Sequence, residues 1–277
     1  CAQDQGQTAP QRWHGARTNV SATTPQNDWN PGTYHRFRGQ RLRPALDLLH
    51  AVTRLPDGDV IDLGCGSGVM GDPLARLGRP LHGVDASPAM LDEAQATAAY
   101  TTLSEADIAQ WAPTKPPALI FSNAALHWLA GHDTLLPRLA ASLAKGGTLA
   151  VQVPHQNNAP SHRVWLSLMA EHFPGRYDPA SGPAVLTPVE YHRLLAPLGT
   201  LSLWETDYYQ VLEPTDGHPV RRFTEATFAR PVLNVLDPAE QAHLIAAYET
   251  VMDHAYPKSA NGSVLFPFRR LFFTLTV

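Results

Sequence analysis

One stretch of the chain decides its fold: residues 59–68 read Asp59-Val60-Ile61-Asp62-Leu63-Gly64-Cys65-Gly66-Ser67-Gly68. The short apolar run over 59–63 stops at a glycine, which is typical of a buried parallel strand. Glycines then occupy alternate positions, and residues 69–77 follow with a helical pattern. Glycine lets a ligand approach backbone that any Cβ would hold off, and a helix start presents free N–H groups. The stretch therefore predicts a strand, a ligand-binding loop and a helix.

The spacing of these glycines argues against a dinucleotide cofactor. A dinucleotide fingerprint that starts at Gly64 places its third glycine at position 69, which is Val69 here. The chain instead has the spacing G-x-G-x-G, with Asp62 two residues ahead of it. NAD is therefore the weaker interpretation, and a tight structural turn is the alternative without a ligand.

Strands and helices alternate around this loop. Apolar residues recur at three- and four-residue intervals over 42–52, which predicts a helix. Further strands are expected at 80–84, 118–122 and 148–153, and helices at 87–98 and 133–143, the first with Ser87 as N-cap and Pro88 at its first position. Strict alternation predicts an α/β, Rossmann-like fold with a doubly wound, mostly parallel sheet.

After Pro154 the alternation loosens, and we expect a helical cap followed by C-terminal strands. Helical patterns cover 161–173 and 188–196, and a β-rich segment covers 200–211. Asp237 opens a long helix as N-cap, with Pro238 in its first turn and Glu240 in a capping box. The mostly apolar segment 264–277 predicts a final strand.

Composition excludes several classes of protein. The chain has 277 residues, 44% of them hydrophobic, which can fill the core of one large domain. A formal charge of −4 leaves no broad basic face, so we expect no nucleic-acid partner. Two cysteines cannot build a disulfide framework and favour a reducing, cytoplasmic location. No apolar run reaches the roughly 18 residues that span a bilayer, so we expect no membrane partner.

Residues 1–27 carry Gln, Thr, Ala and Pro with no apolar period. We interpret them as a poorly ordered extension or a remnant of an expression vector. The amino-terminal Cys1 leaves a lipid-anchored start as an alternative. The ordered part of the chain is expected to begin at Asp28.

Polar side chains follow the expected strands at the edge where the glycine loop lies. Asp85 ends the second strand, where a carboxylate can accept hydrogen bonds from both hydroxyls of a ribose. Asp107 and Ile108, which follow an expected third strand, can place an acceptor and an apolar contact beside an adenine ring. Asn123 ends the fourth strand, expected over 118–122. The alternatives are a helix cap for Asp85 and a solvated loop acid for Asp107.

Over residues 56–153 this combination resembles the class I S-adenosylmethionine-dependent methyltransferases. The resemblance implies their fold, S-adenosylmethionine as cofactor, S-adenosylhomocysteine as product and no metal. One departure is Ala118, where many relatives carry an acid. Cys65 is expected to be a small residue tolerated in the loop, since no base is placed beside it in the sequence. We expect the cofactor to be bound by Asp62, Gly64, Cys65, Gly66, Asp85, Ala86, Asp107, Ile108, Asn123 and Trp128.

Further motifs lie outside the glycine loop. They are Trp29-Asn30-Pro31, Tyr34, Arg41-Leu42-Arg43-Pro44, Leu48-Leu49, His127-Trp128-Leu129, Leu135-Leu136-Pro137-Arg138-Leu139, Gln152-Val153-Pro154, Ser161-His162-Arg163, Trp204-Glu205-Thr206, Tyr208-Tyr209, Arg230-Pro231, Ala255-Tyr256-Pro257, Asn261-Gly262 and 265–272. In these motifs the chain resembles the trans-aconitate 2-methyltransferase family, over nearly its whole length after residue 28. Phe228-Ala229 departs from the family's usual Gly-Leu, and Arg269 from a usual Pro.

This resemblance divides the chain beyond residue 27 into one methyltransferase domain, 28–277. Its parts are an N-terminal cap helix over 28–52, the cofactor-binding core over 56–153, and substrate-side helices and final strands over 154–277. The resemblance implies an O-methyltransferase that forms a monomethyl ester of trans-aconitate or a related small polycarboxylate.

The chemistry of such a reaction agrees with the residues present. A carboxylate acceptor has a pKa of about 4 and is ionised at neutral pH, so we expect no catalytic base. The site needs positive side chains that hold the other carboxylates of the acceptor. For each arginine the alternative is a solvated helix face, for the aromatic residues it is packing, and for His162 it is a helix cap. The expected substrate-binding residues are Trp29, Tyr34, Arg41, His127, His162, Arg163, Tyr209, Arg230 and Arg270.

Two other functions stay open. The stretch Phe121-Ser122-Asn123 with Trp128 also occurs in methyltransferases of a malonyl carrier protein or other small carboxylates. From another class, the chain can be a regulatory protein that binds S-adenosylmethionine without turnover.

Overall fold

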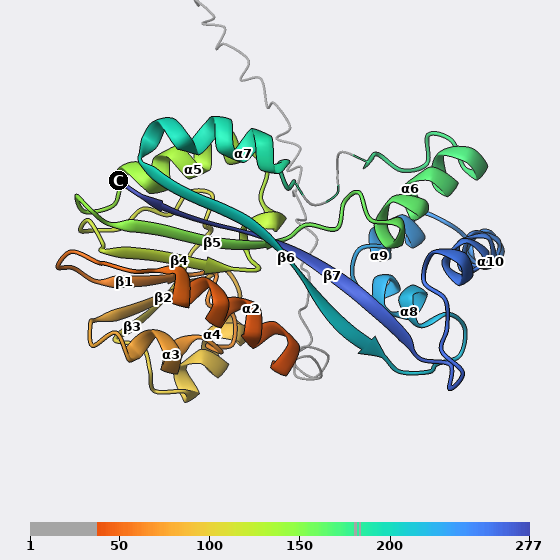
Figure 1. The fold of residues 1–277 in the computed structure, drawn as a ribbon, viewed down its shortest axis with the longest axis horizontal. Helices are drawn as coiled ribbons and strands as arrows, with labels where there is room; N and C mark the ends of the chain where they lie inside the picture. The colour runs from red at the N-terminus through yellow and green to blue at the C-terminus, as the bar shows by residue number, and fades with distance from the viewer. Residues whose placement is uncertain (1–37, 180–181, 183) are drawn as a thin grey trace, which may run out of the picture.

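The computed structural model describes residues 38–179, 182 and 184–277, without the side chains of 38–41. The expectations about 1–27 and about the first part of 28–52, which includes Trp29 and Tyr34, lie outside the described residues. Figure 1 shows two lobes joined by a long two-stranded ribbon, β6 and β7. No helix in the described ranges is long and apolar enough to cross a membrane.

The larger lobe contains a sheet whose described strands lie in the order β3-β2-β1-β4-β5-β7-β6. Strands β1 to β5 pair in parallel, and β7 is antiparallel to both of its neighbours. This confirms the predicted doubly wound, mostly parallel α/β sheet. The strands are β1 Val60–Leu63, β2 Leu81–Asp85, β3 Thr102–Glu105, β4 Leu119–Asn123, β5 Thr148–Pro154, β6 Thr200–Leu212 and β7 Val264–Thr276.

Helices cover both faces of the sheet, as the alternation predicted. Leu48 of α2 and Leu74 of α3 pack with Phe121 on one face. On the other face, Leu136 of α5 and Tyr191 of α7 pack with strand residues that include Ile61, Val151 and Phe273. In this lobe the described helices are α2 Arg38–Ala51, α3 Gly71–Ala75, α4 Pro88–Ala96, the 3-10 helix η1 Leu126–Trp128, α5 His132–Ala141, α7 Pro188–Leu195 and the 3-10 helix η3 Ala196–Leu198.

Local capping signals were predicted well. The Ser87 hydroxyl accepts the N–H of Met90 at 3.4 Å, so Ser87 is the N-cap of α4. The predicted helix over 69–77 is shorter than expected, because turns occupy the loop as far as Met70 and α3 begins only at Gly71. The helix expected from Ser161 begins one residue earlier, since proline is well suited to a first helical position.

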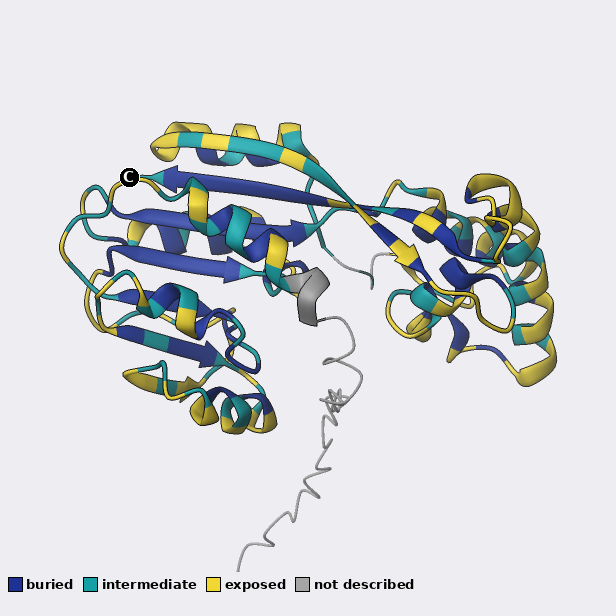
Figure 2. Ribbon diagram, turned by 60° about the horizontal axis from the view of Figure 1, so that its bottom comes forward, coloured by how far each residue is buried: buried dark blue, intermediate teal, exposed yellow. Residues whose placement is uncertain are grey.

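The ribbon leads out of the sheet into the smaller lobe. Strand β5 pairs with β7 only as far as Arg270, whereas β6 and β7 remain paired to Val264. Around the projecting part lie α6 Pro160–His172, α8 Pro219–Glu225, α9 Arg230–Leu233 and α10 Pro238–Ala255. Trp165 of α6 stacks on Tyr248 of α10 with ring centroids 3.8 Å apart. Buried residues therefore form separate cores in the two lobes (Figure 2).

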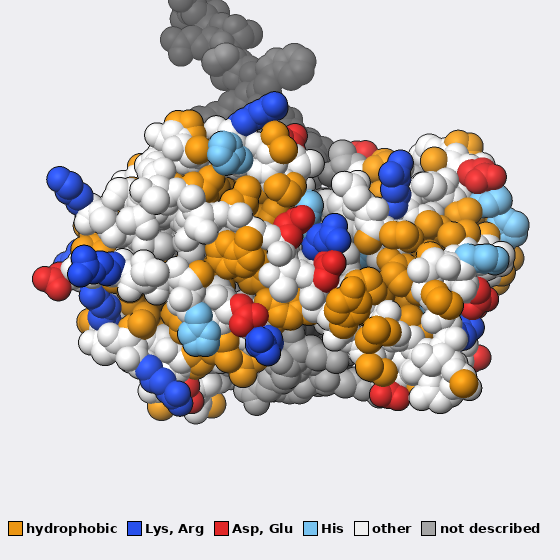
Figure 3. Space-filling model, viewed as in Figure 1, with side chains coloured by type: hydrophobic (Ala, Val, Ile, Leu, Met, Phe, Trp, Pro, Cys, Tyr) orange, Lys and Arg blue, Asp and Glu red, His pale blue; other side chains and the backbone are white. Residues whose placement is uncertain are grey.

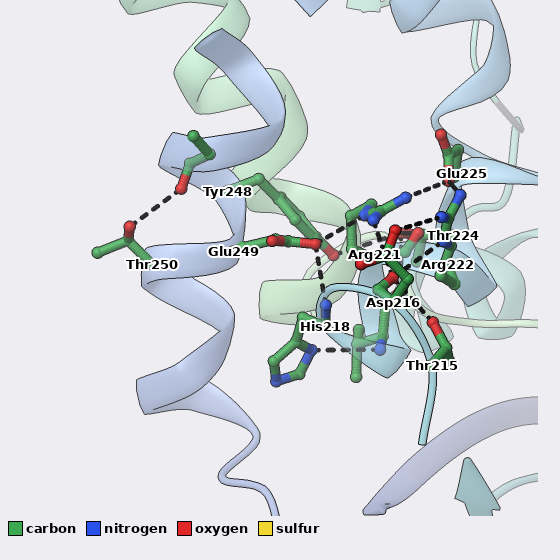
Figure 4. A network of polar contacts seen from close by, with 12 residues as sticks. Thr215, Asp216, His218, Arg221, Arg222, Thr224, Glu225, Tyr248, Glu249 and Thr250 are labelled. Carbon is green, nitrogen blue, oxygen red and sulfur yellow. Dashed lines mark hydrogen bonds and ion pairs between the residues drawn. The ribbon is translucent and has the colours of Figure 1, made fainter. Parts of the chain in front are cut away.

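The smaller lobe is also held by a polar network between α8 and α10 (Figure 4). The buried Arg221 donates from Nε to Glu249 at 2.8 Å and from Nη1 to Glu225 at 2.6 Å. The backbone N–H of His218 donates to the same oxygen of Glu249 at 2.9 Å. Because two of the hydrogen-bond partners of Arg221 are carboxylates, its charge is compensated where it is buried.

Candidate cofactor and substrate site

The glycine loop follows β1 with a backbone that glycine adopts readily. Gly64, Gly66 and Gly68 have φ values of 79°, 52° and 76°, in the left-handed region. A Cβ on Gly64 would lie 2.3 Å from the Cβ of Ala125, and one on Gly68 would lie 3.0 Å from the Cα of Ala94. Close packing therefore requires glycine at 64 and 68 whether or not a ligand is bound.

Asp85 connects the end of β2 to this loop. Its Oδ2 accepts the backbone N–H of Gly66 at 2.8 Å, and its Oδ1 accepts that of Ser87 at 2.9 Å. The N-cap of α4 is Ser87, so the alternative in which Asp85 caps the helix is wrong. An ionised carboxylate has about four acceptor sites, so both oxygens can still accept ribose hydroxyls.

The side chains of Asp62 and Cys65 are buried beneath the glycine loop. Tyr100 donates its hydroxyl to Asp62 Oδ2 at 2.7 Å. Burial raises the pKa of Asp62 to about 7, the Tyr100 hydrogen bond opposes the rise, and the charge of Asp85 adds to it. Burial also raises the pKa of the Cys65 thiol, which keeps it protonated and argues against a nucleophile.

The segment expected beside adenine lies after β3. Asp107 is exposed, and its Oδ1 accepts the N–H of Ala109 at 2.9 Å. Ile108 is buried in the core near Gly64, whereas Ala86 is exposed. The structure thus places the exposed carboxylate of Asp107 next to the buried side chain of Ile108.

Arg138 of α5 organises this segment, and the sequence analysis assigned it no role. Its guanidinium donates to the carbonyl oxygens of Ile108 at 3.2 Å and Ala109 at 2.9 Å, and to that of Trp111. A helix on one side of the sheet therefore holds the loop after β3. The available signal was an arginine on the otherwise apolar segment 135–139.

Unsatisfied polar atoms gather at the carboxyl ends of β1 and β4. The buried Oδ1 of Asn123 and Oγ of Ser67 have no hydrogen-bond partner among the described residues. Next to Asn123, Ala124 has a φ of 53°, a conformation that alanine rarely adopts. Buried polar atoms without partners and a strained backbone are features of ligand sites. This edge of the sheet therefore fits a polar ligand such as S-adenosylmethionine.

His127 and Trp128 follow on η1. Their ring centroids are 4.5 Å apart, with His127 buried and the Trp128 side chain half exposed. The structure places both beyond the end of β4, and the sequence analysis expected His127 to bind the substrate and Trp128 to bind the cofactor.

The four candidate arginines have different surroundings. Arg270 is buried at the carboxyl end of β5, where Nη1 donates to Gln152 Oε1 at 3.2 Å and the guanidinium lies 4.7 Å from the centroid of the Phe268 ring. Arg163 and Arg230 are exposed on α6 and α9, as the solvated alternative predicted. Arg41 lies in α2, but its side chain is outside the described part.

Tyr209 is not brought together with Arg270. It pairs with Pro267 across the ribbon, whereas Arg270 pairs with Thr206. Side chains alternate between the faces of a strand, so Tyr209 lies on the opposite face, where it is 66% exposed. Its neighbour Tyr208 lies on the Arg270 face and donates its hydroxyl to Asp47 of α2 at 2.7 Å. Of these two tyrosines, the structure therefore places Tyr208, and not the Tyr209 named in the sequence analysis, on the face of Arg270.

His162 is buried in the smaller lobe. Burial lowers its pKa to about 4, so the imidazole is neutral at pH 7. Its Nδ1 lies 3.0 Å from the hydroxyl oxygen of Ser161, and its ring is 4.5 Å from that of Phe228. The N-cap of α6 is Ala159, so the alternative of His162 as a helix cap is wrong.

Charged side chains on the molecular surface are of mixed sign. In Figure 3 acidic, basic and histidine side chains are interspersed across the middle of the face shown. Several are paired on the ribbon, where Arg269 donates to Asp207 at 2.9 Å and His155 contacts Glu205. The buried Arg270 lies on the other face of the ribbon from these pairs.

Comparisons with known proteins agree with this arrangement. A family model described as a methyltransferase domain matches residues 34–199. The trans-aconitate 2-methyltransferase of Paracidovorax citrulli is 38% identical over 255 residues, which cover 89% of this chain and 97% of that protein. The trans-aconitate 2-methyltransferase of Methylobacterium nodulans is 41% identical over 251 residues, which cover 88% and 96%.

Solved structures support the fold. The YcgJ protein from Bacillus subtilis has a TM-score of 0.53 at 14% identity, with 87% of this chain and 98% of that chain covered. A putative methyltransferase from Bacillus halodurans has a TM-score of 0.55 at 13% identity, with 84% and 98% covered. At these identities the likeness establishes the methyltransferase fold alone.

Proposed function

The chain belongs to the trans-aconitate 2-methyltransferase family, and we propose that it transfers a methyl group from S-adenosylmethionine to one carboxylate of trans-aconitate or a related small polycarboxylate. The products are a monomethyl ester and S-adenosylhomocysteine. The observation that carries the proposal is the buried guanidinium of Arg270, at the carboxyl end of β5 in a sheet with a glycine loop after β1. A buried cation at a ligand-binding edge favours an anionic acceptor.

Cofactor binding is assigned to the loops after β1, β2, β3 and β4. Gly64 and Gly66 offer backbone atoms for contact with the cofactor. Asp85 has acceptor sites left for the ribose hydroxyls. Asp107 and Ile108 flank the adenine ring. When bound, S-adenosylmethionine supplies an electrophilic methyl group on a positively charged sulfur. The Oδ1 of Asn123, which has no partner in the described part of the chain, offers an acceptor to a ligand donor at the same edge.

The acceptor itself requires little chemistry from the protein. A carboxylate with a pKa of about 4 is already a nucleophile at pH 7, so no residue has to remove a proton. The protein's contribution is to hold the acid in the orientation for in-line transfer and to exclude water. Arg270 is assigned to one of the carboxylates that are not methylated. Neutral His162 can donate one further hydrogen bond without adding charge.

The other parts of the proposal follow from this chemistry. The partner is a small polycarboxylate, so no nucleic acid and no membrane surface is needed as substrate. No metal is required, because an ionised carboxylate and a sulfonium react without a Lewis acid. Within the described residues, no group of three or more His, Cys, Asp or Glu is arranged to hold a metal ion. We also propose a cytoplasmic location, because a chain with two cysteines suits a reducing compartment.

The proposal is tested by methyl transfer from S-adenosylmethionine labelled in its methyl group. We expect label in a base-labile methyl ester when trans-aconitate is the acceptor, and little with a malonyl thioester or a monocarboxylate. Label on the thioester instead would replace trans-aconitate with the malonyl-carrier-protein reaction. Binding of S-adenosylmethionine with no label on any acid would favour a regulatory protein.

A further inference from the structure

Gln152 lies where the sheet meets the ribbon. It is fully buried on β5, beside Asn123 of β4 on one side and Phe272 of β7 on the other. Its side chain projects on the same face as Ala150, which packs with α2. A glutamine inside the otherwise apolar run 149–154 is the exception in that part of the strand and needs a reason.

The hydrogen bond to Arg270 determines how the Gln152 amide is oriented. A guanidinium has donors only, so the amide atom 3.2 Å from Arg270 Nη1 must be the oxygen, Oε1. The Nε2 group therefore points elsewhere. Nε2 is buried and has no hydrogen-bond partner within residues 38–179, 182 and 184–277. Leaving such a buried donor unpaired destabilises the folded protein.

A purely structural role for Gln152 explains the contacts of its two oxygen atoms but not the position of its amide hydrogens. Its backbone oxygen accepts the N–H of Ala124 at 2.9 Å, and its side-chain oxygen holds Arg270. Neither contact uses the amide hydrogens. The neighbouring Oδ1 of Asn123 also has no hydrogen-bond partner among the described residues, so the two side chains do not satisfy each other. Both atoms are available for groups that this described part of the chain does not provide.

We infer that Gln152 is a specificity-determining residue whose Nε2 donates to a carboxylate oxygen of the acceptor, while its Oε1 orients Arg270 toward the same acid. This inference rests on the proposed function. A neutral amide and a guanidinium together bind an anion through two kinds of N–H donor. Because both recognise a carboxylate other than the one methylated, they favour acids with several carboxylates. Gln152 has no exposure in this structure, so the acid reaches Nε2 when the junction between the lobes opens.

The variant Gln152→Glu separates the two halves of this role. It keeps the shape and the oxygen that holds Arg270, but replaces the donor by an anionic oxygen that repels a carboxylate. We expect the KM for trans-aconitate to rise at least about tenfold, the loss of one charged hydrogen bond. The Kd for S-adenosylhomocysteine and the Tm should stay unchanged. The advantage of tricarboxylates over monocarboxylates in kcat/KM should shrink in the same variant.

Binding provides a second readout that needs no turnover. Calorimetry of trans-aconitate with the complex of enzyme and S-adenosylhomocysteine should show the same rise in Kd for Gln152→Glu. The matched control is Gln210→Glu, which places a carboxylate at another buried glutamine, on β6, and should leave the Kd of the acid unchanged. If Gln152→Glu does not fold, Gln152→Met, which has similar volume and no donor, is measured in the same way.

The possible results distinguish this inference from the proposed function. Unchanged affinity for the acid in Gln152→Glu, with normal activity of the unmodified enzyme, overturns the role of Gln152 alone. Equal losses of acid and cofactor affinity overturn it too, because they indicate a general effect on folding. An unmodified enzyme that neither binds nor methylates any polycarboxylate overturns both.

Discussion

The carboxylate of Asp85 accepts the backbone N–H of Gly66 at 2.8 Å, which ties the end of β2 to the loop after β1. The other oxygen of Asp85 accepts the N–H of Ser87, the N-cap of α4. One side chain thus connects the glycine loop, a strand end and a helix start. Asp85 is therefore oriented by the protein before a ligand arrives, which reduces the entropy cost of binding.

Asp85→Ala should weaken S-adenosylmethionine binding strongly. The substitution removes the proposed ribose acceptors and releases the N–H of Gly66, so we expect a loss of about 2 kcal/mol or more. That corresponds to a Kd about 30-fold higher, measured by calorimetry. Asp92→Ala, at an exposed acid on α4, is the control and should leave the Kd unchanged. Equal Kd values for the two variants would remove Asp85 from the cofactor site.

Gly64→Ala should destabilise the fold through two effects. The φ of 79° strains any residue with a Cβ, and that Cβ would lie 2.3 Å from the Cβ of Ala125. Gly78→Ala has the first effect only, because its φ is 68° and nothing lies within 4 Å of an added Cβ. In urea unfolding, we expect a loss of about 1–2 kcal/mol for the control and clearly more for Gly64→Ala. Similar losses would mean that the loop moves away from Ala125 at no cost.

Asp62 should make the stability of the free protein depend on pH. Its pKa is about 7 in the folded protein and about 4 in an unfolded chain, so the folded state binds the proton more tightly. Stability is therefore unaffected below pH 4, falls as the pH rises from about 4 to about 7, and stays reduced above that.

Asp62→Asn removes this titration and keeps an acceptor for Tyr100. Relative to the unmodified protein, the variant should gain about 2 kcal/mol more at pH 8 than at pH 5, measured by urea unfolding without cofactor. Asp72→Asn, at an exposed acid on α3, should show the same small change at both pH values. A gain for Asp62→Asn that does not vary with pH would contradict the raised pKa.

Arg270→Met should affect the acceptor and spare the cofactor. Methionine keeps much of the apolar stem but removes the buried guanidinium, so the KM for trans-aconitate should rise more than about tenfold. The Kd for S-adenosylmethionine should change little. The control is the adjacent Arg269→Met, which removes an exposed ion pair with Asp207 on the opposite face of the ribbon and should leave the KM unchanged. The reverse pattern, with cofactor affinity lost and KM retained, would give Arg270 a structural role.

Local patterns were sufficient to predict most of the fold. The buried run before Gly64, the Ser87 N-cap and the Asp237 capping box all depend on residues close in sequence, and the structure contains each of them. The alternation of strands and helices predicted the parallel sheet, because parallel strands need helical crossovers. The helix after the glycine loop was predicted too long, since its pattern does not reveal the turns that precede Gly71.

Tertiary structure alone decided which candidate side chains lie on the proposed substrate side of the molecule. In sequence, Arg163, Arg230 and Arg270 are equivalent cations, yet only Arg270 of these three is buried. The distinction arises because β7 inserts between β5 and β6 and carries Arg270 next to Gln152, a residue 118 positions away.

The amino-acid sequence by itself determined the sheet, the glycine loop and the family of this protein. These features depend on the short-range pattern of apolar residues and on residue types, such as glycine, that a particular backbone conformation requires. The face on which each ribbon side chain lies depends instead on the register of two 13-residue strands. A shift of one residue in that register would turn over the side chains of the strand that moves, exchanging Tyr208 with Tyr209 if β6 moves, or Arg270 with Arg269 if β7 moves. Packing of the ribbon against both lobes sets this register, and the register determines which ribbon side chains lie on the proposed substrate side.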